Sequence, residues 1–262
     1  MAKVFAIANQ KGGVAKTTTC INLAASLVAT KRHVLLIDLD PQGNATMGSG
    51  IDKHALEHSI YDVLIGECDL SQAMQFSEHG GYQLLPANRD LTAAEVALLE
   101  MKMKESRLRY ALAPIRENYD YILIDCPPSL NMLTINALVA ADGVIIPMQC
   151  EYYALEGLSD LVNSIQRIAQ LLNPKLQIEG LLRTMYDPRI SLTNDVTAQL
   201  KEHFGDKLYD AVIPRNVRLA EAPSFGMPAL VYDKQSRGAI AYLALAGELV
   251  RRQRAAAKTD TA

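Results

Sequence analysis

The sequence has no tryptophan and only four phenylalanines, and aromatic residues make up 6% of its 262 residues. Its cysteines are few and widely spaced, with no C-x-x-C pair: Cys20, Cys68, Cys126 and Cys150. This spacing argues against a disulfide framework or a zinc site and favours reduced thiols. No apolar run approaches the roughly 18 residues that a membrane-spanning helix needs, and no amino-terminal signal peptide is visible. We therefore expect a cytoplasmic protein.

A large excess of charge of one sign is also missing. The formal net charge is −3, with 49% apolar and 21% charged residues, which is typical of an ordinary globular protein. A protein that binds nucleic acid over its whole surface is therefore excluded, although a local basic patch is not.

Short apolar runs alternate along the chain with longer segments of helical period. The strands that we expect are 4–8, 34–37, 82–85, 121–124, 144–147, 178–182 and 211–213. Several of them are apolar at every position, as parallel strands covered on both faces are. A helix with one apolar stripe extends from about Leu155 to Leu172 and stops at Asn173-Pro174.

This alternation predicts an α/β fold with one doubly wound, mostly parallel sheet and helices on both faces. We expect a single domain over residues 1–254 and a flexible tail over 255–262. Ligands of such sheets bind at the carboxyl ends of the strands. Three of the predicted strands run into polar loops there, so we expect these loops to converge on one site.

The first of these loops, NQKGGVAKTTT, extends from Asn9 to Thr19. Compared with the usual phosphate-loop pattern G-x-x-x-x-G-K-[ST], Gln10 and Ala15 replace the two glycines. Backbone N–H groups that lead into a helix N-terminus bind phosphate. Lys16 would reach the β- and γ-phosphates, and the Thr17 hydroxyl would bind Mg²⁺. A glycine-rich turn without a ligand is the weaker interpretation, because such a turn does not require Lys-Thr at the helix start.

The other two loops carry carboxylates. Asp38 and Asp40 in DLDPQGNAT lie two residues apart and so face the same side of an extended chain. One would hold a metal-bound water and the other would orient the attacking water; alternatively, Asp38 caps a helix and Asp40-Pro41 is only a turn. Asp125, which ends the run Tyr-Ile-Leu-Ile, has the position of a Walker-B aspartate that holds Mg²⁺.

Together these motifs resemble the ParA/Soj partitioning ATPases of the MinD/ParA group of P-loop ATPases. The resemblance covers nearly the whole chain, including CEYYALEGL at 150–158 and IPRNVRLAEAPSFG at 213–226. It implies a chromosome-segregation ATPase that uses ATP and Mg²⁺, in which Lys11 reaches the partner's phosphates across an ATP-sandwiched homodimer. Catalysis would involve Lys11, Lys16 and Asp40, and Mg²⁺ would be held by Thr17, Asp38 and Asp125. The nucleotide would be held by Lys11, Gly12, Gly13, Val14, Ala15, Lys16, Thr17 and Thr18, with Met185, Pro214, Arg215 and Asn216 around the adenine.

The resemblance further implies that the ATP-bound dimer binds double-stranded DNA without sequence preference, which would place the protein on the nucleoid. Arg189 and Arg218 match the family's basic patch, with Arg251, Arg252, Arg254 and Lys258 as further candidates. A ParB-type centromere-binding protein would stimulate hydrolysis and so release the DNA. Most relatives carry glycine at position 15, so we expect Ala15 to impair dimer closure or hydrolysis more than ATP binding.

Other functions fit the sequence less well. A MinD-like ATPase needs an amphipathic C-terminal helix with bulky apolar residues, and RRQRAAAKTDTA offers only alanines, so we expect no stable membrane association. A nitrogenase-like ATPase needs cysteines that hold a cluster, and the cysteines here show no such pattern. A nucleotide-gated adaptor that binds ATP and scarcely hydrolyses it stays open as an alternative.

Overall fold

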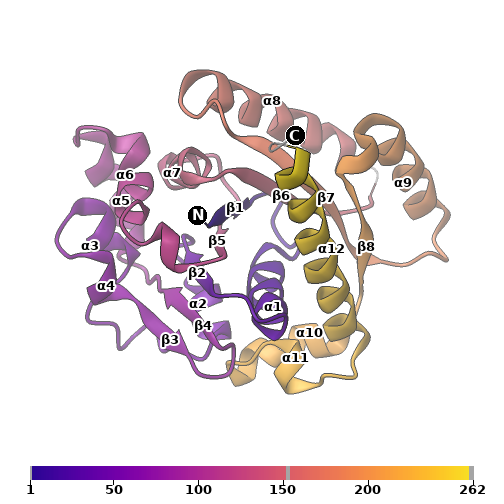
Figure 1. The fold of residues 1–262 in the computed structure, drawn as a ribbon, viewed down its shortest axis with the longest axis horizontal. Helices are drawn as coiled ribbons and strands as arrows, with labels where there is room; N and C mark the ends of the chain where they lie inside the picture. The colour runs from indigo at the N-terminus through magenta and orange to yellow at the C-terminus, as the bar shows by residue number, and fades with distance from the viewer. Residues whose placement is uncertain (1, 152–153, 260–262) are drawn as a thin grey trace.

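A computed structural model describes residues 2–151 and 154–259, apart from the side chains of 154–156, 258 and 259. The described strands form one sheet in the order β3-β4-β2-β5-β1-β6-β7-β8 (Figure 1). Their bounds are β1 (Lys3–Ile7), β2 (Val34–Asp38), β3 (Gln75–Ser77), β4 (Tyr82–Leu85), β5 (Tyr121–Asp125), β6 (Gly143–Gln149), β7 (Gln177–Tyr186) and β8 (Leu208–Pro214). Pairing is parallel except between β3 and β4. The predicted fold class is therefore confirmed.

Helices cover both faces of the sheet (Figure 1). Their bounds are α1 (Lys16–Ala29), α2 (Asn44–Gly48), α3 (Ile60–Ile65), α4 (Leu70–Ala73), α5 (Leu91–Leu99), α6 (Arg107–Leu112), α7 (Met132–Ala140), α8 (Ala154–Leu171), α9 (Ser191–Phe204), α10 (Val217–Glu221), α11 (Ala229–Tyr232) and α12 (Arg237–Thr259). Short 3₁₀ segments lie at Lys104–Ser106, Arg116–Asn118, Gly205–Lys207 and Ala222–Phe225.

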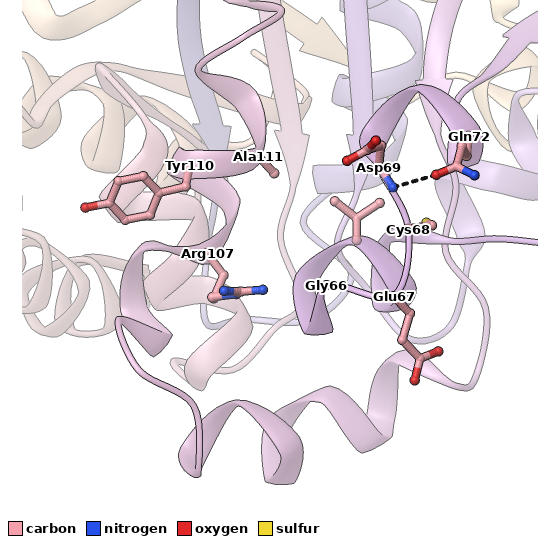
Figure 2. Close-up of a pocket in the computed structure, with 9 residues that line it drawn as sticks. Gly66, Glu67, Cys68, Asp69, Gln72, Arg107, Tyr110 and Ala111 are labelled. Atoms are coloured by element: carbon pink, nitrogen blue, oxygen red, sulfur yellow. Dashed lines mark hydrogen bonds between the residues drawn. The ribbon is translucent and has the colours of Figure 1, made fainter.

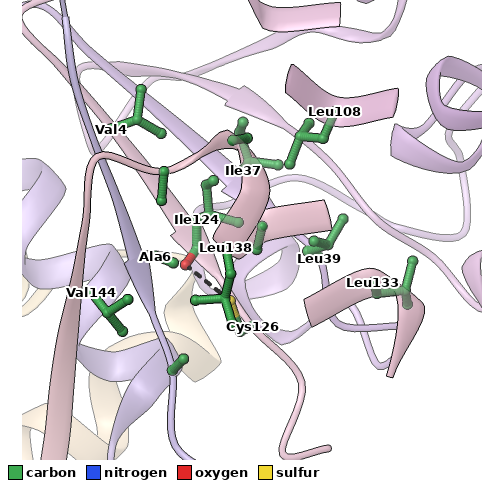
Figure 3. Close-up of a cluster of buried hydrophobic side chains, with 14 of the residues drawn as sticks. Val4, Ala6, Ile37, Leu39, Leu108, Ile124, Cys126, Leu133, Leu138 and Val144 are labelled. Atoms are coloured by element: carbon green, nitrogen blue, oxygen red, sulfur yellow. Dashed lines mark hydrogen bonds between the residues drawn. The ribbon is translucent and has the colours of Figure 1, made fainter. Parts of the chain in front are cut away.

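The apolar core is split into two layers by the sheet. One cluster joins β1, β2, β5 and β6 to α5, α6, α7 and α8, and Figure 3 shows part of it around Ala6, Ile37, Ile124 and Cys126. The other cluster packs α1 and α12 against the opposite face. The central strands are buried on both faces, so their carboxyl ends are held at fixed positions along one edge of the sheet.

Several elements differ from the sequence-based expectation: β7 is longer than the expected 178–182, β8 is longer than 211–213, and β3 was not expected. Strand β3, QFS, is short and its Phe76 is 48% exposed, so it gives no continuous apolar run. The last helix, α12, continues through Thr259, so residues 255–259 belong to this helix and do not form a separate tail; residues 260–262 lie outside the described part of the chain.

Candidate functional site

The three polar loops converge, as expected, because the strands that precede them are neighbours in the sheet. β5 pairs with both β1 and β2, and Asp125 is in register with Ile7 on one side and with Asp38 on the other. The phosphate-type loop follows β1 directly and leads into α1 at Lys16. One edge of the sheet therefore brings together the loop, Asp38 and Asp125.

The loop between β1 and α1 adopts a curled backbone with two left-handed residues. Gly13 has φ +74°, and Ala15 has φ 67° and ψ 34° at the N-cap of α1. The Thr184 hydroxyl on β7 donates to the Val14 carbonyl at 3.1 Å and so fixes the loop to the sheet. A Cβ at Gly12 or Gly13 would meet no atom within 4 Å. The protomer itself therefore leaves the space around both glycines open.

Lys16 is buried at the start of α1, and its Nζ donates to the Lys11 carbonyl at 3.2 Å. Burial lowers the pKa of Lys16, and the negative charge of Asp125 is the largest opposing influence. Asp40 also opposes the lowering, so the loop lysine lies within electrostatic reach of both carboxylates.

Asp38 is fully buried, and its carboxylate oxygens already accept hydrogen bonds from the protein. Its Oδ2 accepts from the Thr46 amide at 2.8 Å and the Thr46 hydroxyl at 2.7 Å, and its Oδ1 accepts from the Asp40 amide at 3.2 Å. Burial raises the pKa of Asp38 to about 6, against the opposing effect of the Thr46 bonds. Asp38 thus caps the first turn of α2, and its predicted role as a metal ligand stays untested.

Asp125 is equally buried, yet neither of its carboxylate oxygens has a hydrogen-bond partner among the described residues. Burial raises its pKa to about 8, helped by the negative charge of Asp38 and opposed by the Thr17 hydroxyl. A buried carboxylate without a partner is expensive unless a cation or donor compensates it. Of the predicted metal ligands, Asp125 is therefore the one whose oxygens are available.

Asp40 lies at the entrance to the site in a tight turn. Its Oδ1 accepts from the Gln42 amide at 2.9 Å, and its carbonyl accepts from the Gly43 amide at 2.9 Å. The side chain is partly exposed, so this carboxylate, unlike that of Asp125, can contact water.

Lys11 does not point into the loop that carries it. Its ammonium group forms an ion pair with Glu151, after β6, at 2.6 Å, and the two side chains are 48% and 47% exposed. The Asn9 side chain accepts from the Lys11 amide at 2.9 Å and donates to the Pro147 carbonyl at 2.8 Å. Glu151 lies in the CEYYALEGL stretch, whose Tyr152 and Tyr153 are outside the described residues.

The predicted base-binding residues line one small cavity of about 210 Å³ beside the loop. Its lining residues are Ala15, Thr18, Met185, Ile213, Pro214, Arg215, Asn216, Leu219 and Ala220. Ile213, Leu219 and Ala220 were not predicted, although they belong to the same IPRNVRLA segment. The cavity is open to the loop through Ala15, so a ligand could occupy both.

A separate hollow of about 370 Å³ lies between the α3–α4 connection and α6 (Figure 2). It is lined by Gly66, Glu67, Cys68, Asp69 and Gln72 on one side and by Arg107, Tyr110 and Ala111 on the other, and Val63 also contributes to the lining. Arg107 uses its Nε to bond the Leu64 carbonyl at 2.8 Å, at the end of α3. None of the predicted site residues lines this hollow.

The two arginines predicted to bind DNA are exposed and paired with carboxylates. Arg189 bonds Asp187 through Nε at 2.9 Å and Nη2 at 2.6 Å, and Arg218 pairs with Glu221 at 2.8 Å and Asp233 at 3.3 Å. Hydrogen bonds from Arg189 lower the pKa of Asp187 to about 2, and the charge of Arg237 adds to this effect. Arg237, which the sequence did not single out, therefore lies close to the Arg189 pair.

The further basic candidates at the chain's end are less accessible or less well defined. Arg252 bonds Glu248 and the carbonyls of Asp206 and Leu208 and covers the ring of Tyr209 at 4.4 Å. Arg251 and Arg254 are exposed, and the side chain of Lys258 lies outside the described residues.

Comparison with known protein families gives a match over residues 2–178 to the model described as an AAA domain. A Pseudomonas putida protein of uncharacterized function is 85% identical over 99% of this chain and 98% of its own length. The chromosome partitioning protein ParA of Caulobacter vibrioides is 53% identical over 96% of this chain and 95% of its own. The sporulation initiation inhibitor protein Soj of Bacillus subtilis is 51% identical over 95% and 98%, respectively.

Solved structures with the same fold include nucleotide-binding proteins. Cobyrinic acid a,c-diamide synthase from Mycobacterium smegmatis with bound ADP and magnesium superposes with a TM-score of 0.84 at 39% identity, covering 97% of this chain and 96% of that one. The cell division ATPase MinD of Pyrococcus furiosus superposes with a TM-score of 0.78 at 25% identity, covering 96% and 99%.

The uncompensated carboxyl of Asp125 leads to a prediction about stability and pH. The folded chain holds a proton on Asp125 up to a pKa of about 8, whereas an unfolded chain loses it near the ordinary pKa of about 3.9. Between these values the folded state binds more protons, so stability falls as pH rises. We expect the melting temperature of the ligand-free protein to drop by about 3 °C or more between about pH 5.5 and about pH 8.5.

The Asp125→Asn variant should lose most of this slope and melt higher than the wild type at the alkaline end. Differential scanning calorimetry at matched ionic strength measures both. Equal slopes in the two proteins would assign the pH dependence to other groups.

Proposed function

The chain belongs to the AAA domain family and, within it, to the ParA/Soj group, and from this premise we propose that it is a DNA-partitioning ATPase that uses Mg²⁺ and ATP. ATP closes a sandwich homodimer, the dimer binds DNA without sequence preference, and hydrolysis releases it. The observation that carries the proposal is the buried edge of the sheet where Lys16 and the unpartnered carboxylate of Asp125 lie beside the open glycine loop.

The triphosphate would lie along the loop from Lys11 to Thr18, with Lys16 at the β- and γ-phosphates. The adenine would enter the cavity lined by Met185, Pro214, Arg215 and Asn216. A cavity of this kind, mostly apolar with a few polar groups, suits a planar base.

Mg²⁺ fits the donors that the protomer leaves free. The ion prefers oxygen ligands and keeps several waters, so one carboxylate and one hydroxyl together with phosphate oxygens suffice. Asp125 supplies carboxylate oxygens that have no hydrogen-bond partner in the described part of the chain, and the Thr17 hydroxyl lies close enough to oppose the rise of the Asp125 pKa. Asp38 would act indirectly, because Thr46 and Asp40 already use its oxygens. When bound, the ion would neutralise charge on the transferring phosphoryl group.

Lys11 would supply the second cation, in trans. In the protomer its side chain is half exposed and, among the described residues, pairs with the half-exposed Glu151; such pairs are worth about 0.2–1 kcal/mol. A triphosphate of a second protomer offers more negative charge than one carboxylate, so closure would transfer Lys11 from Glu151 to the phosphates. This transfer would link nucleotide state to dimerisation.

DNA binding by a protein of net charge −3 requires a local basic surface that the dimer doubles. Arg189 and Arg218 would provide it, with Arg237 nearby. Their present carboxylate partners are partly exposed, so DNA phosphates could compete with these carboxylates for the two arginines. A ParB-type centromere-binding protein would stimulate hydrolysis on the nucleoid in the cytoplasm.

Two other functions have weaker support, and a third differs from the proposed one only in its rate of ATP hydrolysis. The M. smegmatis diamide synthase is 39% identical, against 53% for the C. vibrioides ParA, which favours partitioning over amidation. For a MinD-like function, the exposed end of α12 offers alanines and no bulky apolar residues, and among the described residues no helix is long and apolar enough to cross a membrane. A nucleotide-gated adaptor would differ from the proposed partitioning ATPase only in its rate of ATP hydrolysis, which a steady-state ATPase assay measures.

Asp40 and Lys16 should have separable roles. Asp40→Ala should leave ATP binding and dimerisation largely intact and slow turnover by about 100-fold or more, because it removes the group that orients the attacking water. Lys16→Ala should weaken nucleotide binding itself. Equilibrium binding of a fluorescent ATP analogue and single-turnover hydrolysis measure the two steps. An Asp40→Ala variant that loses affinity but keeps the wild-type rate per bound ATP would contradict the assignment.

Ala15 holds a left-handed conformation that costs an L-residue about 1–2 kcal/mol relative to glycine, and its methyl group borders the proposed nucleotide cavity. We expect Ala15→Gly to raise ATP-dependent dimerisation and partner-stimulated turnover by about three- to tenfold, which corresponds to about 0.7–1.4 kcal/mol. Nucleotide affinity of the monomer should change less. Sedimentation velocity with ATP and with ADP checks this, and identical dimerisation in both proteins would show that the methyl group is neutral.

Arg189 and Arg218 should contribute to DNA affinity independently of sequence. Replacing either by Ala should weaken binding to all duplexes alike and reduce the salt dependence by roughly one unit per lost contact. The control is Arg109→Ala, at an exposed arginine on α6 that does not belong to the predicted basic patch. Fluorescence anisotropy across a salt series, with ATP present, gives both quantities. If the variant with both Arg189→Ala and Arg218→Ala kept the wild-type DNA affinity, the DNA-binding surface would be assigned to Arg251 and Arg254 instead.

A further inference from the structure

The turn that carries Asp40 is fixed at both of its ends. At the β2 end, the Asp40 amide donates to Asp38 at 3.2 Å. At the α2 end, Thr46 bonds Asp38 and also accepts from the Ala87 amide at 2.9 Å. Between these anchors, the Asp40 carboxylate accepts a hydrogen bond from the Gln42 amide. The orientation of this carboxylate therefore depends on the backbone conformation of residues 41–43.

Lys53 is the side chain that contacts the middle of this turn from outside. Its Nζ donates to the Gln42 carbonyl at 2.5 Å. Its aliphatic stem lies against Gly43, because a Cβ at Gly43 would be 2.8 Å from the Lys53 Cδ. Gly43 is buried and has φ +62°, so this position both forms the turn and makes room for the lysine.

Lys53 is itself held by a well-anchored segment. The Ile51 amide donates to the Thr46 carbonyl at 3.2 Å, and the Gly50 amide donates to the Met47 carbonyl at 3.0 Å. The following residue, His54, donates its amide to the Asp52 side chain at 2.9 Å. The lysine therefore extends from a segment fixed to α2 back to the turn that precedes α2.

The turn borders open space on the side where Lys53 lies. A hollow of about 410 Å³ is lined there by Pro41, Gln42, Asn44, Lys53, Arg89 and Thr92. Lys53 makes no ion pair with any described residue, although lysines at a protein surface usually contact carboxylates or water. Its ammonium group instead donates a hydrogen bond to a backbone carbonyl of this turn.

We propose that Lys53 is a positioning residue for hydrolysis: it holds the Gln42 peptide so that the Asp40 carboxylate keeps the orientation needed to direct the attacking water. The inference rests on the proposed role of Asp40. A catalytic group must be held within about 0.5 Å of its productive position, and an exposed turn beside an open hollow needs a further contact to hold it so. Lys53 neither touches the nucleotide site nor lines the base cavity, so it should affect turnover and not binding.

The test is steady-state ATP hydrolysis by the full-length protein with saturating Mg²⁺. Lys53→Met keeps the aliphatic stem against Gly43 and removes the donor. It should lower kcat about three- to tenfold, the effect expected for loss of one solvent-exposed hydrogen bond, with KM for ATP within about twofold. Lys53→Arg retains a donor and should recover at least about half of the rate. Lys175→Met, at an exposed lysine before β7, is the matched control and should leave kcat unchanged.

A double-variant cycle separates positioning from a general structural role. If Lys53 acts through Asp40, Lys53→Met should have no further effect in the Asp40→Ala background. An unchanged kcat in Lys53→Met, an equal further loss in the Asp40→Ala background, or no recovery with Lys53→Arg would each overturn the inference. Failure of the proposed function is distinct, because wild-type protein would then not hydrolyse ATP, or Asp40→Ala would hydrolyse it at the wild-type rate.

Discussion

The site is organised by two aspartates that end neighbouring strands and are both removed from water. Asp38 and Asp125 are in register at the ends of β2 and β5, and each is fully buried. Two carboxylates so placed cannot both be ionised without compensation. The protein compensates Asp38 with Thr46, which fixes the start of α2, and leaves Asp125 without a partner among the described residues. The turn that carries Asp40 and the buried ammonium of Lys16 are arranged around this unequal pair.

Much of this arrangement follows from local sequence. Strands such as Tyr121–Asp125 are apolar at every position until the final carboxylate, so both the strand and the placement of Asp125 at the carboxyl edge could be predicted. The convergence of the three loops followed from strand order in a doubly wound sheet. Met185 and Pro214 line one cavity. The sequence suggested that these two residues belong to one site only through the resemblance to the ParA/Soj family.

The features that could not be predicted depend on contacts between distant or unpatterned residues. Glu151 reaches Lys11 across 140 positions, and a glutamate after a strand carries no sign of that pairing. Lys53 lies in an irregular segment, and nothing local indicates that its ammonium returns to Gln42. The two roles considered for Asp38 both use a carboxylate at a strand end, so local sequence could not choose between them; the hydrogen bonds from Thr46 could not be foreseen either, because they depend on how the chain returns into α2.

The ion pair between Lys11 and Glu151 adds a free-energy cost to closure of the proposed dimer. One such exposed pair contributes about 0.2–1 kcal/mol to the open protomer, too little to matter for folding. A symmetric dimer would close through the same contact on both sides, so closure would break two pairs and oppose dimerisation by about 0.4–2 kcal/mol, or about two- to thirtyfold in the equilibrium constant. In the proposed dimer, the γ-phosphate of ATP would offset the loss of the Lys11–Glu151 pair at each active site. ADP lacks this phosphate. An individually weak surface interaction thus becomes, through symmetry, a term that separates the two nucleotide states.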